Sequence, residues 1–156
     1  QQVRTNQLLT DMQSRFQQSG MAEMAGWIGK EARSAAPVSF DGSPVILSPD
    51  PAVGATGAVL VVRDMQGRLI AREAMPVSTA PYAWLGADAT GTPLPAGNYR
   101  LSLESRSGEE IIATRGMEHF ARVIEVRGDA NGAKLVLQGG AEVAASAVTA
   151  LRLPGN

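Results

Sequence analysis

The sequence predicts an all-β protein in which an antiparallel sandwich is inserted into a small barrel, with a helix ahead of both. Short β-prone runs separated by glycine and proline turns follow one another after residue 36. Residues 99–104 alternate between apolar and polar side chains, which is typical of a half-buried strand. Apolar residues at helical spacing stand near the beginning of the chain. Together these patterns indicate a β fold with little helix.

The first segment of the chain predicts a helix that ends at Gly20. It contains no glycine or proline before that point, and Leu8 or Leu9, Met12 and Phe16 are three or four positions apart. The apolar stripe is thin and the remaining positions are rich in Gln, Ser and Thr, so such a helix is unstable alone in water. It either packs on its own domain or serves as a partner or self-association helix.

The sandwich is predicted from strands that are bounded by turn residues. Gln66-Gly67 and Ser107-Gly108 are turn signals between runs of β-branched and apolar residues. In the clearest strand, period two places Tyr99, Leu101 and Leu103 on one face. The predicted strands are 45–47, a hairpin over 58–75, 82–84, 99–104 and 110–114.

A second β unit is predicted in the last forty residues, where short strands are joined by glycine turns. Phe120, Ile124 and Val126 are available to its core. Such strands suit a small five-stranded barrel, because glycines permit the backbone of tight corners. The predicted strands are 119–127, 134–137, 142–144 and 148–153.

This C-terminal unit is one strand short of a barrel, and the isolated region 27–40 could supply the missing strand. The sandwich would then be an insertion within the barrel. The expected domains are a helix and lead-in over 1–25, a split barrel over 26–43 and 118–154, and a sandwich over 44–117.

Composition and charge exclude several classes of function. The net charge is −1, and five Arg alternate with five Glu between residues 98 and 127, so no stretch offers the one-sided basic field of a nucleic-acid binder. The chain has no cysteine, which excludes disulfides, thiol catalysis and thiolate metal sites. No apolar run is long enough to span a membrane. The chain begins without Met or a secretory signal pattern, so we expect a fragment of a longer protein.

No residue pattern predicts catalysis. His119 is the one histidine, and no nucleophile, acid or second metal ligand accompanies it in the sequence. Glu109 and Glu110 are adjacent on a strand and would point to opposite faces. The turn 128–132 lacks the further acidic ligands of a calcium loop. We therefore expect no catalytic, cofactor-binding or metal-binding residues, and no cofactor.

The segment 82–101, called the signature segment below, resembles a family pattern. Residues 82–86 read Tyr-Ala-Trp-Leu-Gly, and 91–101 read Gly-Thr-Pro-Leu-Pro-Ala-Gly-Asn-Tyr-Arg-Leu. This is similar to the Trp-x-Gly and Gly-x-x-(Leu/Ala)-Pro-x-Gly-x-Tyr pattern of the immunoglobulin-like domain of flagellar hook-capping proteins, also called basal-body rod modification proteins. The polar lead-in 1–9, the Trp-Ile-Gly-Lys segment 27–30 and the turns and strands of 128–151 also resemble that family.

The resemblance implies an immunoglobulin or fibronectin III-like sandwich inserted into a Tudor-like (SH3-like) barrel. It implies a non-enzymatic scaffold that is exported through the flagellar type III apparatus and caps the growing hook. Its expected partners are hook protein subunits and further copies of itself, and its expected location is the hook tip, outside the cell. The alternative is an adhesion or glycan-binding module of a secreted protein.

Overall fold

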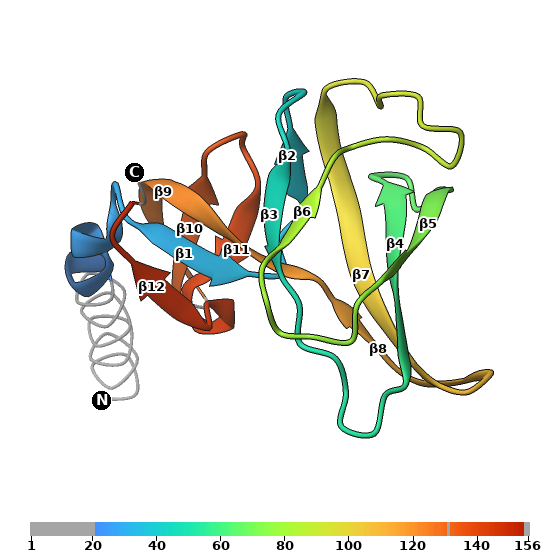
Figure 1. Cartoon of the computed structure of the whole chain (residues 1–156). Coiled ribbons are helices and arrows are strands. Elements are labelled where there is room, and N and C mark those ends of the chain that lie inside the picture. Colours follow the sequence, from blue (N-terminus) through green and yellow to red (C-terminus); the bar gives the residue numbers. More distant parts are fainter. Residues whose placement is uncertain (1–20, 131, 155–156) are drawn as a thin grey trace, which may run out of the picture. The chain divides into compact units, whose positions relative to one another are not determined.

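The computed structural model describes residues 21–130 and 132–154, and its contacts divide the chain into two compact units (Figure 1). The sandwich unit is Arg33–Phe120, and the split unit combines Gln1–Ala32 with Ala121–Asn156. The helix predicted to end at Gly20 lies outside the described residues. Residues 21–24 are helical and lead into a short 3-10 helix, η1 (Ala25–Trp27), so helical structure is present beyond the predicted stop.

One sheet of the sandwich unit has the order β2-β7-β4-β5, and β8 also pairs with β7. All of these pairings are antiparallel. The strands are β2 (Val38–Phe40), β4 (Gly57–Asp64), β5 (Leu69–Met75), β7 (Gly97–Ser107) and β8 (Glu110–Gly116). The other layer pairs β3 (Val45–Ser48) with β6 (Tyr82–Trp84) and with the first residues of β9 (Glu118–Asp129).

The core of the sandwich unit forms from alternate strand positions, as period-two patterning requires. Tyr99, Leu101 and Leu103 are buried, which confirms the face predicted for 99–104. Their neighbours in the same cluster come from both layers and include Leu47, Leu60, Val62, Ala71, Met75, Trp84 and Met117. Burial of apolar side chains on both inner faces is the main force that holds such a sandwich together.

Val38 and Phe40 belong to the core of the sandwich unit, and not to the barrel in which they were expected. The physical reason is strand pairing: Val38 lies opposite Tyr99, and Phe40 lies opposite Gly97. The pairing makes β2 a strand of the sandwich sheet and directs both side chains to its core. The sandwich unit accordingly begins at Arg33, ahead of the predicted boundary at 44.

The strand order in the split unit is β11-β10-β9-β1-β12. β10 (Gly132–Leu137) pairs with β9 and with β11 (Glu142–Ala144), and a short 3-10 helix, η2 (Ala145–Ala147), precedes β12 (Ala150–Arg152). The region that supplies the additional strand is β1 (Glu31–Ser34), shorter than the predicted 27–40.

The prediction that Ile124 of β9 is available to the core is wrong. Val123 is fully buried, while Ile124 is 50% exposed. Two consecutive β-branched residues leave the facing of a strand ambiguous in sequence, and only the pairing of β9 with its neighbours decides which one enters the core. The all-β fold class itself, a sandwich inserted into a second small β unit, is confirmed.

Candidate functional site

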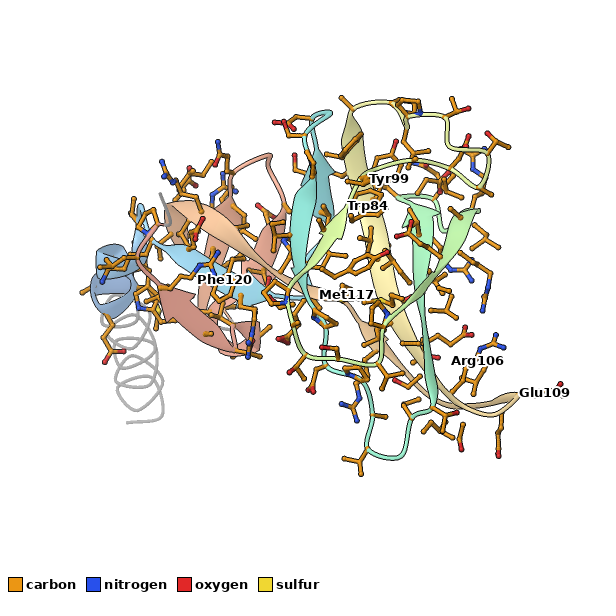
Figure 2. All side chains as sticks on the ribbon, in the orientation of Figure 1. Trp84, Tyr99, Arg106, Glu109, Met117 and Phe120 are labelled. Carbon is orange, nitrogen blue, oxygen red and sulfur yellow. The ribbon has the colours of Figure 1, made fainter. Side chains whose placement is uncertain are left out.

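The signature segment forms an aromatic cluster inside the sandwich unit. Trp84 of β6 is fully buried, and its ring centroid lies 5.3 Å from that of Phe40 and 6.0 Å from that of Tyr99. The two ring pairs are tilted or edge-on, which are favourable aromatic geometries. Figure 2 shows Trp84 and Tyr99 directed between the layers. The indole Nε1 is buried and has no hydrogen-bond partner among the described residues.

Gly86 explains why the pattern requires glycine two residues after the tryptophan. Its φ is +71°, a left-handed conformation that side chains disfavour. A Cβ at this position would also lie closer than 3.0 Å to three carbons of the Phe40 ring. The glycine therefore lets the chain leave β6 directly against the aromatic cluster.

Asp88 organises the loop that follows. Its Oδ1 accepts hydrogen bonds from the backbone amides of Thr90 and Thr92, and the Leu94 amide donates to the Gly86 carbonyl. The hydrogen bond from the Thr90 hydroxyl, together with the bonds from the two amides, lowers the pKa of the Asp88 carboxyl. These contacts give the glycine and proline residues of the segment a fixed path between the two layers.

Tyr99 closes the signature segment. Its hydroxyl donates a 2.6 Å hydrogen bond to the carbonyl of Pro95, four residues upstream, and burial raises the pKa of the phenol. This arrangement resembles the tyrosine corner of immunoglobulin-like sandwiches. The conspicuous residues of the pattern are thus structural: they hold the crossover and fill the core, and none presents a reactive group to solvent.

His119 lies in the core of the sandwich unit, with 4% of its surface exposed. Its Nε2 is 2.9 Å from the carbonyl oxygen of Ala36, so this nitrogen carries the proton that is donated. Burial lowers the pKa of the imidazole, and the hydrogen bond to Ala36 and the charge of Glu118 oppose that shift in part. The residue is a satisfied core histidine.

The free energy of unfolding should fall as the pH drops from about 6.5 toward 5, above the range in which ordinary carboxylates titrate. The folded pKa of His119 is depressed, so the unfolded chain takes up the proton first and stability is lost as the pH decreases toward the folded pKa. The slope should not exceed about 1.4 kcal/mol per pH unit. His119→Gln, which can still donate to Ala36, should flatten this part of a pH series of urea titrations. An unchanged slope in that variant would assign the dependence to another group.

The described residues contain no group of three or more His, Cys, Asp or Glu side chains that could hold a metal ion. Glu109 and Glu110 are both exposed, and Figure 2 shows Glu109 at the tip of the hairpin between β7 and β8. Within the same described residues, no helix is long and apolar enough to cross a membrane.

Glu104 was not identified from the sequence. This residue lies on the face of β7 that points away from the core, and 6% of its surface is exposed. Its Oε1 accepts hydrogen bonds from Arg72 of β5 at 2.5 Å and from Arg106 at 2.8 Å. Burial raises its pKa, but the bonds from Arg106 and Arg72 outweigh that effect and the net pKa is lowered. Glu104 and Arg106 are two positions apart on one strand, so the sequence alone could have suggested this ion pair. The hydrogen bond from Arg72 could not be foreseen, because it depends on the pairing of β5, β4 and β7.

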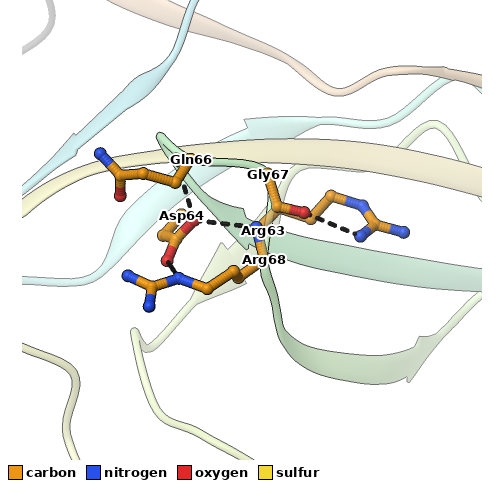
Figure 3. A network of polar contacts seen from close by, with 5 residues as sticks. All are labelled: Arg63, Asp64, Gln66, Gly67 and Arg68. Atoms are coloured by element: carbon orange, nitrogen blue, oxygen red, sulfur yellow. Dashed lines mark hydrogen bonds and ion pairs between the residues drawn. The ribbon is translucent and has the colours of Figure 1, made fainter.

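The turn between β4 and β5 forms a second polar network (Figure 3). Asp64 accepts hydrogen bonds from the amides of Gln66 and Arg68 and from the Arg68 guanidinium at 2.8 Å. The hydrogen bond from the Arg68 amide leads the interactions that lower the pKa of this carboxyl. Arg63 donates to the carbonyl of Gly67. Asp64 is therefore already engaged within the turn.

The geometry defines the class first. A two-layer sandwich with a buried tryptophan and a tyrosine corner is typical of an immunoglobulin-like module. Residues 34–109 match the family described as the FlgD Ig-like domain. No curated protein sequence matches the chain.

Two solved structures are similar over most of their length. FlgD from P. aeruginosa has a TM-score of 0.64 at 20% identity, covering 79% of this chain and 97% of that one. FlgD from Xanthomonas campestris, whose structure is described in terms of the hook capping essential for flagellar assembly, has a TM-score of 0.65 at 20% identity, covering 86% and 99%. The resemblance to hook-capping proteins stated from the sequence is confirmed.

Proposed function

We propose that this protein is a non-enzymatic scaffold that caps the growing flagellar hook and promotes the assembly of hook subunits. The observation that carries the proposal is the match of residues 34–109 to the FlgD Ig-like domain. The similarity of 79% and 86% of this chain to two FlgD structures, one of which is described in terms of hook capping, supports it.

The internal geometry agrees with a scaffold role. The residues of the signature segment are used for packing, and His119 is buried and hydrogen-bonded to a backbone carbonyl. Neither offers the exposed acid, base or nucleophile that catalysis requires. A glycan-binding module needs exposed aromatic rings, whereas Phe40, Trp84 and Tyr99 are buried against one another. The geometry thus favours the scaffold over the adhesion alternative.

The finer features of the role are also proposals. The protein would be exported through the flagellar type III apparatus, associate with further copies at the hook tip, and be displaced when the hook is complete. A cap that must advance as each subunit is inserted cannot bind its partners tightly. We therefore expect its contacts with hook subunits to be polar and transient.

Deletion of the gene segment that encodes this chain should abolish hook elongation in the parent organism, and a copy supplied in trans should restore it. Electron microscopy of purified basal bodies gives the readout, and secreted hook subunits in the medium show that export still operates. A Leu85→Ala copy is a control, since Leu85 is 67% exposed beside the core and its truncation should leave the fold intact. Hooks of normal number and length in the deletion strain would contradict the proposal.

A further inference from the structure

The face of the sandwich sheet that points away from the core carries a cluster of arginines. Strand alternation directs Leu60, Val62 and Leu101 inward, so the residues between them point outward. The outward positions of β4, β5 and β7 carry four arginines, which we call the arginine face: Arg63, Arg72, Arg100 and Arg106.

One carboxylate, that of Glu104, occupies an outward position on these three strands, all of which lie in the described part of the chain. Its Oε1 already accepts hydrogen bonds from Arg72 and Arg106. The face therefore has an excess of three positive charges, although the chain as a whole has a net charge of −1. The pairing with Glu104 holds two guanidinium groups in place over the sheet.

Arg63 and Arg100 face each other directly across β4 and β7. Like charges at directly opposite positions destabilise an antiparallel pair. The Arg63 guanidinium donates to the Gly67 carbonyl, and the nearby Asp64 carboxylate is committed to the turn and to Arg68 (Figure 3). Folding gives no evident reason for this juxtaposition, whereas a partner that supplies carboxylates would relieve it.

Apolar side chains lie beside the arginines. Leu69 is paired with Arg63 and Ile111 is paired with Arg106, and each is 50% exposed. Between them Val61 is 3% exposed on the same face. Arginine is enriched at protein interfaces, and exposed apolar side chains rimmed by polar residues are typical of interaction sites.

We propose that the arginine face is a docking surface for a protein that presents a cluster of carboxylates. Guanidinium groups bind carboxylates through paired, directional hydrogen bonds, and two of the four are pre-oriented by Glu104. A nucleic acid fits less well, since a central carboxylate and flanking aliphatic side chains oppose a continuous track of phosphates, and the chain has a pI of about 5.8. This inference does not depend on the role in hook assembly.

The test uses the full chain with Arg63→Gln and Arg100→Gln combined. These two arginines are exposed and are not bonded to Glu104, so the double variant leaves the buried carboxylate paired. The probe is a fluorescein-labelled poly-glutamate peptide, with binding followed by fluorescence anisotropy at low and high salt. Amide chemical-shift changes in the labelled protein locate the bound peptide. Arg122→Gln, at an exposed position on β9, is the matched control for loss of an arginine.

We expect poly-glutamate to bind weakly, to dissociate at high salt, and to shift the amides of β4, β5 and β7. The double variant should lose about tenfold in affinity at low salt, because two of the three excess charges are removed. Its melting temperature should be unchanged or higher, since the like-charge pair is gone. Arg122→Gln should bind as the original protein does.

Three results would overturn the inference. Poly-glutamate could shift the amides near arginines on all surfaces of the protein, and Arg122→Gln could then lose as much affinity for the peptide as the double variant. Affinity could stay unchanged when Arg63 and Arg100 are replaced in a folded protein. An oligothymidylate of equal charge could bind the same face more tightly than the peptide, which would assign the face to nucleic acid.

Discussion

Trp84→Ala should be the most damaging single substitution in the sandwich unit, at a cost of about 3–5 kcal/mol in the free energy of unfolding. The indole is fully buried and contacts the rings of both Phe40 and Tyr99. Its removal leaves a cavity. The two layers cannot move together to close this cavity, because strand pairing fixes the backbone of each layer. A loss of this size is a large share of the roughly 5–15 kcal/mol that holds an ordinary domain together.

Urea denaturation measured by circular dichroism provides the value, and two variants test the reasoning. Leu85→Ala removes the adjacent, largely exposed side chain and should change stability by less than about 0.5 kcal/mol. Trp84→Phe keeps part of the ring volume and removes the unpaired indole N–H, so it should cost less than the alanine variant. Equal losses for the phenylalanine and alanine variants would show that ring volume is not what stabilises this core.

Gly86→Ala should have the second-largest effect, about 2–5 kcal/mol, because two costs add. The first is the left-handed backbone at φ +71°, and the second is the overlap of the new methyl group with the ring of Phe40. The smaller conformational freedom of alanine in the unfolded chain offsets only a fraction of this loss. Phe40 is held between Trp84 and Tyr99 and has little room to move away.

Gly91→Ala separates the two costs. Gly91 lies in the same segment with a φ of +84°, but a Cβ there would have no atom within 4 Å. It should therefore show the backbone cost alone, about 1–2 kcal/mol. The difference between the two variants measures the packing cost against Phe40. If Gly91→Ala were as damaging as Gly86→Ala, the close approach to the ring would not be the reason for glycine at position 86.

Local pattern was sufficient for much of the fold. Alternation identified the buried face of Tyr99, Leu101 and Leu103, and the resemblance of the signature segment to a family pattern was visible in its own residues. These features depend on residues close together in the chain, whose side-chain directions follow from the period of a strand.

Pairing between distant segments decided what local pattern left open. Val38 and Phe40 belong to the sandwich because β2 pairs with β7, about sixty residues further along the chain. Val123 and Ile124 are equally suited to a core, and the neighbours of β9 bury the first and expose the second. The single histidine is buried because His119 lies opposite Leu47 and within hydrogen-bonding distance of Ala36.

The sequence by itself determined the all-β class, because strand period and turn residues are local properties of the chain. Only the tertiary structure brought Arg63, Arg72, Arg100 and Arg106 to one face. Along the chain these arginines alternate with acidic residues and cancel in charge. Strand alternation and cross-strand register then leave Glu104 as the one carboxylate among these arginines on the outward face of the fully described strands β4, β5 and β7. This grouping depends on contacts between residues that sequence spacing cannot relate.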